Sequence, residues 1–147
     1  MVKVVFMAGP AGSGKTRIAK VLEEFSDFVY IGSDEIREEL WGNAADQRHP
    51  EKVFQVFYER ARKAIEEGKS CVLDATFLTK KVRKDGLRAL DGLEFESYCI
   101  EMVTSLEKCL LRNQMRDRQV PLSVVRRQYE SFERPGVEEG FKDIVRL

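Results

Sequence analysis

The sequence predicts an α/β fold in which a parallel sheet is covered by helices on both faces. Two features predict it: short apolar runs rich in β-branched residues, and segments of helical periodicity between them. Such alternation is typical of parallel strands joined by helical crossovers. The 147 residues, 43% of them hydrophobic, match the commonest size of one domain and suffice for a core without disulfides or metal. We therefore expect a single domain spanning 1–147.

Five apolar runs are the candidate strands. They lie at 3–7, 28–31, 71–73, 95–102 and, more weakly, 143–147. Between them, apolar residues recur every three or four positions, as they do along one face of a helix. The helical sets are Ile18, Leu22 and Phe25; Val53, Phe57, Ala61 and Ile65; Leu106 and Leu110; and Val125, Tyr129 and Phe132.

Several short signals mark helix ends and loops. Gly68 and Pro135 stand where helices should stop, and residues 104–107 fit a capping box that opens the next helix. The polar stretches 41–50 and 117–121, interrupted by Gly, Asn or Pro, are expected to be loops over functional openings.

Composition argues against several classes of protein. Lys plus Arg and Asp plus Glu both number 25, so the net charge is zero and no polybasic tail indicates sequence-independent nucleic-acid binding. Apolar runs are too short for a signal segment or a membrane span. Cys71, Cys99 and Cys109 lie in apolar runs, which is typical of buried, reduced thiols. We expect a cytoplasmic protein without membrane contact.

The most specific motif is GPAGSGKT at 9–16, which satisfies G-x-x-x-x-G-K-[ST]. It directly follows the first predicted strand and precedes the first predicted helix, as a phosphate-binding P-loop requires. Its glycines let backbone N–H groups turn toward phosphate oxygens, and the helix adds its positive dipole end. The residues expected to bind the nucleotide are Gly9, Ala11, Gly12, Ser13, Gly14, Lys15 and Thr16.

Two P-loop residues and a later aspartate have expected roles of their own. Lys15 should reach the β- and γ-phosphates of ATP or another nucleoside triphosphate, and Thr16 should place its hydroxyl on Mg²⁺. Asp74 follows the third predicted strand, where it can hold a magnesium-bound water or the Thr16 hydroxyl. The alternatives are a glycine-rich turn with an incidental lysine, and an aspartate that begins a turn.

An acceptor site is expected at the end of the second predicted strand. Asp34 emerges there at the carboxyl edge of the sheet, where α/β proteins bind ligands, and can accept a hydrogen bond from an attacking hydroxyl. Arg37, three residues later on the same helix face, suits a phosphate or carboxylate of the acceptor. Alternatively, Asp34 caps the helix and Arg37 is a solvated partner of Glu35 or Glu38.

An arginine-rich lid is expected at about 112–126. Arg112 and Arg116, four residues apart, are the candidates for stabilising charge on the transferring phosphoryl group when the lid closes. The alternative is a solvated basic helix end. Arg118, Arg126 and Arg127 are assigned to that second class.

Together these residues resemble the P-loop kinase family that includes the polynucleotide 5′-hydroxyl kinases of phage and bacterial nucleic-acid repair. The resemblance spans essentially the whole chain and rests on four segments: GPAGSGKT; Asp34-x-x-Arg37; Asp74-Ala75-Thr76-Phe77-Leu78; and RNQMR at 112–116, followed by Val120-Pro121 and the helix that ends in Tyr129-Glu130-Ser131-Phe132.

The resemblance implies a sheet of about five strands in the order 2-3-1-4-5, with the P-loop after the central strand. It also implies Asp34 as general base on a 5′-hydroxyl, Arg37 on acceptor phosphate, and Arg112 and Arg116 on nucleotide phosphates. ATP, Mg²⁺ and a nucleic-acid 5′-end are the implied ligands. Without a DxDxT phosphatase motif, the chain fits a stand-alone kinase or an excised N-terminal domain.

Two other functions fit parts of the sequence. A small-molecule kinase is favoured by the zero net charge and the short acceptor loop. A non-catalytic nucleotide-binding module would use a basic cluster as a docking face, although such clusters are more often solvated helix faces. That cluster is Lys80, Lys81, Arg83, Lys84 and Arg88. Trp41 is interpreted as core, with base stacking as the alternative, and His49 has no assigned role.

Overall fold

The computed structural model describes residues 1–147 and contains one sheet of five parallel strands in the order β2-β3-β1-β4-β5. The strands are β1 (Lys3–Ala8), β2 (Val29–Gly32), β3 (Cys71–Asp74), β4 (Glu96–Glu101) and β5 (Asp143–Arg146). All five predicted strands are therefore present, each within two residues of its expected ends. The strand order implied by the family resemblance is confirmed.

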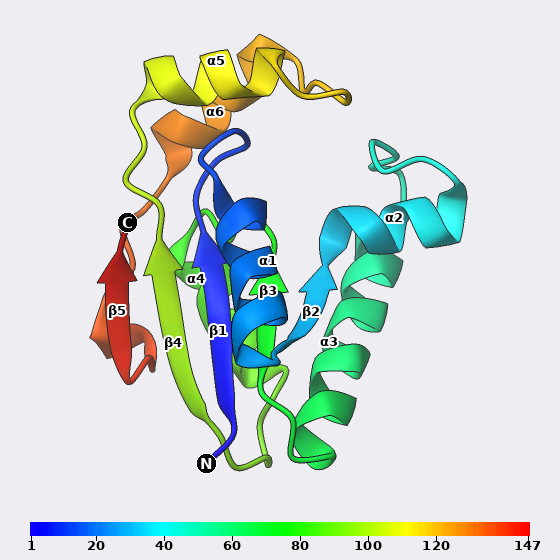
Figure 1. Ribbon diagram of the computed structural model, residues 1–147, viewed down its shortest axis with the longest axis vertical. Helices are drawn as coiled ribbons and strands as arrows, with labels where there is room; N and C mark the ends of the chain where they lie inside the picture. Colours follow the sequence, from blue (N-terminus) through cyan, green and yellow to red (C-terminus); the bar gives the residue numbers. More distant parts are fainter.

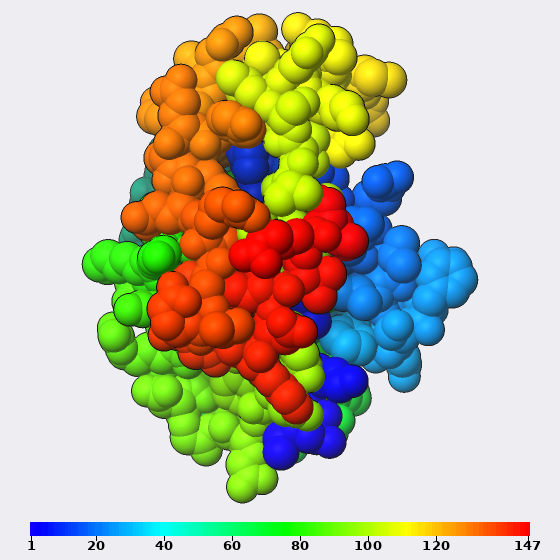
Figure 2. Space-filling model, turned by 90° about the vertical axis from the view of Figure 1, so that its left-hand side faces the viewer, coloured from blue at the N-terminus to red at the C-terminus, as the bar shows by residue number.

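Six α-helices and one short 3₁₀ helix join the strands (Figure 1). They are α1 (Lys15–Ser26), α2 (Ser33–Trp41), α3 (Pro50–Glu66), α4 (Lys80–Arg88), α5 (Leu106–Gln114), α6 (Leu122–Ser131) and η1 (Val137–Glu139). α5 and α6 lie across the carboxyl ends of the strands. Figure 2 shows the same two helices, yellow and orange, above the red β5.

The alternating side chains of β1 supply two cores, one on each face of the sheet. Val4 and Phe6 belong to the larger core, together with residues of α3 such as Phe57. Val5 and Met7 belong to the smaller core, against which α1 packs. Because both faces are covered, most of the buried positions of β1 and β3 are apolar, as in buried parallel strands generally.

Parallel register brings several strand ends to one edge. Met7 of β1 lies beside Asp74 of β3, and Gly32 of β2 lies on the other side of Asp74. The residues that follow β1, β2 and β3 therefore meet at this edge. They include the P-loop and Asp34, which the sequence separates by more than fifteen positions.

Two expectations need correction. The helix after 104–107 begins at Leu106 with Ser105 as its cap, because the Ser105 hydroxyl accepts from the Lys108 N–H; Thr104 instead donates to the Ser13 carbonyl of the P-loop at 2.8 Å. The basic cluster on α4 is not a continuous exposed face, because Arg83 is fully buried and pairs with Glu139 at 2.8 Å.

The three cysteines are buried and free, as predicted. Burial raises the pKa of the Cys71 and Cys99 thiols to about 12. None of the helices combines the length and apolar character needed to cross a membrane.

Candidate active site

The P-loop occupies the connection between β1 and α1, and two of its glycines are required by their surroundings. Gly12 and Gly14 have φ values of 80° and 99°, in the left-handed region that side chains other than glycine disfavour. A Cβ on Gly12 would lie 2.2 Å from the carbonyl oxygen of Cys109, so α5 packs directly against the loop. The glycines therefore allow the backbone conformation of the P-loop and the close packing of α5 against it.

Lys15 is a buried cation at the start of α1. Its Nζ donates to the Pro10 carbonyl at 3.1 Å, which folds the side chain back over the loop. Burial lowers the pKa of Lys15, whereas the charges of Asp74 and Asp34 oppose that shift. A desolvated ammonium in this position attracts a phosphate strongly.

Thr16 and Asp74 are in direct contact. The Thr16 hydroxyl donates to Asp74 Oδ2 at 2.7 Å, and Asp74 is buried at the end of β3. Hydroxyl and carboxylate oxygens are ligands that Mg²⁺ accepts, and this ion commonly takes its remaining ligands from substrate phosphates and water. No cluster of three or more His, Cys, Asp or Glu side chains could hold a metal by itself. The pair fits a magnesium ion that arrives with a nucleotide.

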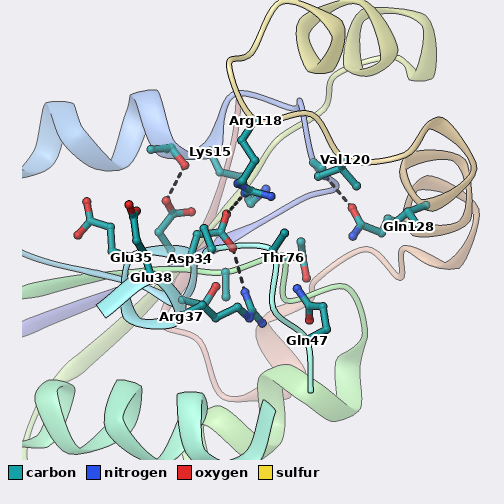
Figure 3. A pocket seen from close by; sticks show the side chains of 18 of the residues that line it. Lys15, Asp34, Glu35, Arg37, Glu38, Gln47, Thr76, Arg118, Val120 and Gln128 are labelled. Atoms are coloured by element: carbon teal, nitrogen blue, oxygen red, sulfur yellow. Dashed lines mark hydrogen bonds and ion pairs between the residues drawn. The ribbon is translucent and has the colours of Figure 1, made fainter. Parts of the chain in front are cut away.

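Asp34 lies in the first turn of α2 between two arginines (Figure 3). Arg37 Nη1 donates to its Oδ1 at 2.9 Å, and Arg118 Nη2 donates to its Oδ2 at 2.6 Å. Asp34 makes no side-chain cap, and Arg37 is buried rather than a solvated partner of Glu35 or Glu38. Both features contradict the capping alternative.

Arg118 corrects a prediction, because it was expected at a solvated helix end. It comes from the segment between α5 and α6 and crosses the cavity to Asp34, and its side chain is 33% exposed. Arg126 matches the expectation and is exposed on α6. Arg127 is also exposed on α6 but, like Arg118, it lines the same cavity as Asp34.

Arg112 and Arg116 lie over the P-loop. Arg112 Nη1 donates to the Ser13 carbonyl at 3.2 Å. α5 ends at Gln114, so Arg116 follows the helix instead of sharing a helical face with Arg112. Both arginines nevertheless line one hollow of about 420 Å³ with Gly12, Gly14, Lys15, Thr16 and Arg17.

A single cavity of about 920 Å³ joins the two halves of the candidate site. Lys15, Thr16 and Asp74 line it from the P-loop side, and Asp34 and Arg37 line it from α2. On the side of α6, the Gln128 side chain accepts from the Ala11 N–H at 2.9 Å. The cavity is thus bounded by the carboxyl ends of β2 and β3, the P-loop, α2, and α6 with the segment that precedes it.

A sequence profile of the AAA domain family matches residues 4–135, which is most of the chain. The chain belongs to the AAA domain family.

Three solved structures share the fold of this AAA domain at low sequence identity. A protein from Chloroflexus aurantiacus, proposed to be a kinase, has a TM-score of 0.79 at 15% identity, over 99% of this chain and 87% of the other. A gluconokinase from Sinorhizobium meliloti gives 0.67 at 18% identity, over 99% and 81%. A chain of the Pnkp1/Rnl/Hen1 RNA repair complex gives 0.78 at 15% identity, over 88% and 43%.

The sequence alone missed several residues that line the cavity of this AAA domain. They are Tyr30, Gln47, Phe54, Thr76, Arg118 and Gln128. Tyr30 had a usable signal, because it lies two residues before Gly32 on a strand that ends at the site. Gln47 and Gln128 had none, since polar residues in a loop or on a helix do not reveal which element they face.

Trp41 and His49 lie beside each other, with ring centroids 4.9 Å apart. Trp41 is 37% exposed, so its interpretation as a core residue is wrong. Neither residue lines the main cavity.

Proposed function

We propose that this AAA domain is a kinase that transfers the γ-phosphoryl group of ATP to a hydroxyl group, with Asp34 as the base. The observation that carries the proposal is that Lys15, Thr16 and Asp34 line one cavity. Lys15 and Thr16 belong to a motif that binds nucleotide phosphates. Asp34 stands across from them, where a hydroxyl could meet the terminal phosphate.

In the proposed reaction, the acceptor oxygen forms a bond to the γ-phosphorus while the bond to the β–γ bridging oxygen breaks. The hydroxyl proton passes to Asp34, and ADP leaves. Lys15, Arg112 and Arg116 would stabilise the negative charge on the phosphate oxygens. The Thr16 hydroxyl and the Asp74 carboxylate would hold Mg²⁺ together with the nucleotide, and the ion would supply further charge neutralisation.

The acceptor is proposed to carry an anionic group near its hydroxyl. Arg37 is 7% exposed and lines the cavity, and its buried Nε has no hydrogen-bond partner. A buried guanidinium nitrogen without a partner favours an anionic ligand. A nucleic-acid 5′-end offers a hydroxyl and a nearby phosphate, and the family resemblance supports this acceptor.

A small hydroxylated metabolite is the second candidate acceptor. The zero net charge favours it, because long nucleic acids are usually held by many cationic contacts. The fold shared with a gluconokinase is consistent with this alternative.

The deciding experiment measures transfer of label from γ-labelled ATP with Mg²⁺. The acceptors are a 5′-hydroxyl oligonucleotide, the same oligonucleotide bearing a 5′-phosphate, and gluconate. We expect label only on the 5′-hydroxyl strand, and a loss of about 10²-fold or more in Asp34→Ala. Exposed Asp91→Ala is the matched control. Label on gluconate alone would support the metabolite kinase, and full activity of Asp34→Ala would exclude the assigned base.

A further inference from the structure

Tyr30, on β2, donates its hydroxyl hydrogen to Oδ2 of Asp74 at 2.6 Å. Thr16 donates to the same oxygen at 2.7 Å. Two hydroxyls from different elements therefore converge on one carboxylate oxygen. Oδ1 of Asp74 receives no hydrogen bond from the protein, so it remains available to a water molecule or ligand.

We propose that Tyr30 is a positioning residue for magnesium: its phenol fixes the rotation of the Asp74 carboxylate so that Asp74 and Thr16 present a preformed site to a nucleotide-bound Mg²⁺. This inference adds a residue to the proposed ATP site and is independent of the acceptor. Side chains that hydrogen-bond to metal-binding groups set the orientation and basicity of those groups. With Thr16 as its only partner, the carboxylate could turn away from the metal.

The surroundings hold the Tyr30 ring in place. Lys20 Nζ lies 3.7 Å from the ring centroid and pairs with Glu35 at 3.1 Å. Burial and the neighbouring charge of Asp74 raise the pKa of Tyr30, so its hydroxyl keeps the hydrogen that it donates. The phenol is therefore a fixed donor throughout the neutral pH range.

Gly32 makes room for this phenol. Tyr30 and Gly32 are two residues apart on β2, so they share one face of the strand. A Cβ on Gly32 would lie 2.6 Å from Tyr30 Oη. The φ and ψ of Gly32, −119° and 131°, suit any residue, so the closeness of Tyr30 accounts for the glycine better than backbone conformation does.

The test measures binding of a non-hydrolysable ATP analogue by calorimetry, in EDTA and across a Mg²⁺ series, without any acceptor. For Tyr30→Phe we expect unchanged affinity in EDTA and a midpoint for Mg²⁺ raised by about 10-fold. Tyr98→Phe is the matched control, because that phenol bonds to Glu96, at the opposite end of β4 from the site. In an Asp74→Asn background, Tyr30→Phe should cause no further change.

Gly32→Ala is a second test of the role of Tyr30, because the added methyl group displaces the phenol without removing its hydroxyl. A folded Gly32→Ala protein should show the same rise in the Mg²⁺ midpoint. The inference is overturned if both variants show the wild-type dependence of analogue affinity on Mg²⁺ concentration. It is also overturned if the variants lose the same affinity in EDTA and in Mg²⁺, or if the affinity of the wild-type protein does not depend on Mg²⁺. Because no acceptor is present, a failure of phosphoryl transfer would be a separate result.

Discussion

Arg118 and Asp34 form an ion pair at 2.6 Å although 84 residues separate them in the sequence. The contact joins the segment between α5 and α6 to the first turn of α2. It therefore connects the expected lid to the residue that we propose as the base. Arg37 holds the other carboxylate oxygen, so Asp34 is fixed from two sides.

For Arg118→Ala, we expect phosphoryl transfer to fall by about 10-fold, because the Asp34 carboxylate loses one of the two groups that orient it. The pair is partly exposed, so the free energy of unfolding should change by less than about 1 kcal/mol. Steady-state transfer kinetics and denaturant unfolding measure the two effects. Exposed Arg126→Ala is the control, and equal kinetics in the two variants would count against the orienting role.

Lys15→Met should separate function from stability. Transfer should fall by about 10²-fold or more, because the variant lacks the cation expected on the phosphates. The fold should be no less stable at neutral pH, because a buried charge has been replaced by an apolar side chain of similar length. Activity assays and urea unfolding measure the two results; a large loss of stability would contradict this account of Lys15.

The same lysine predicts a pH dependence. Its folded-state pKa lies below the ordinary value of 10.5, so between these two values the unfolded chain binds more protons than the folded one. Wild-type stability should therefore rise with pH through this window, relative to Lys15→Met, and the difference should be constant at lower pH. Urea unfolding of both proteins from pH 7 upward tests it, and parallel curves throughout would refute the burial effect.

Gly12→Ala should destabilise the protein more than Gly68→Ala. Both positions have positive φ, which costs about 1–2 kcal/mol for alanine. Only Gly12 also faces a neighbouring atom, the Cys109 carbonyl at 2.2 Å, whereas nothing lies within 4 Å of a Cβ on Gly68. Thermal unfolding of the two variants isolates the packing of α5 on the P-loop. Equal losses of stability in the two variants would mean that α5 can move away from the added Cβ at position 12 without a cost in free energy.

Glu139→Gln should cost about 3 kcal/mol of unfolding free energy, because it leaves the charge of Arg83 buried without its counter-ion. Arg83 also donates to the Phe77 and Glu133 carbonyls, so it ties α4 to the chain around η1. Glu138→Gln, exposed in the same turn, is the control for chemical denaturation. A loss no greater than in the control would remove this structural role.

The sequence by itself determined the strands and the P-loop because both are local. Strand positions follow from short apolar runs, and the phosphate cradle is built from eight consecutive residues whose glycines define its backbone. The contact between Asp34 and Arg37 could also be predicted from the sequence, because side chains three residues apart on a helix lie close together.

Only the tertiary structure decided which distant side chains meet. Arg118 belongs to a basic segment that is typical of a solvated helix end, yet it reaches Asp34. Arg83 lies in a basic cluster, yet it is buried, where it forms an ion pair with Glu139, 56 residues further along the chain. Tyr30 meets Asp74 because β2 and β3 pair in a particular register. Local patterns encode backbone conformation, whereas the burial of a charged side chain and the partner of a charge or hydroxyl depend on how the whole chain packs.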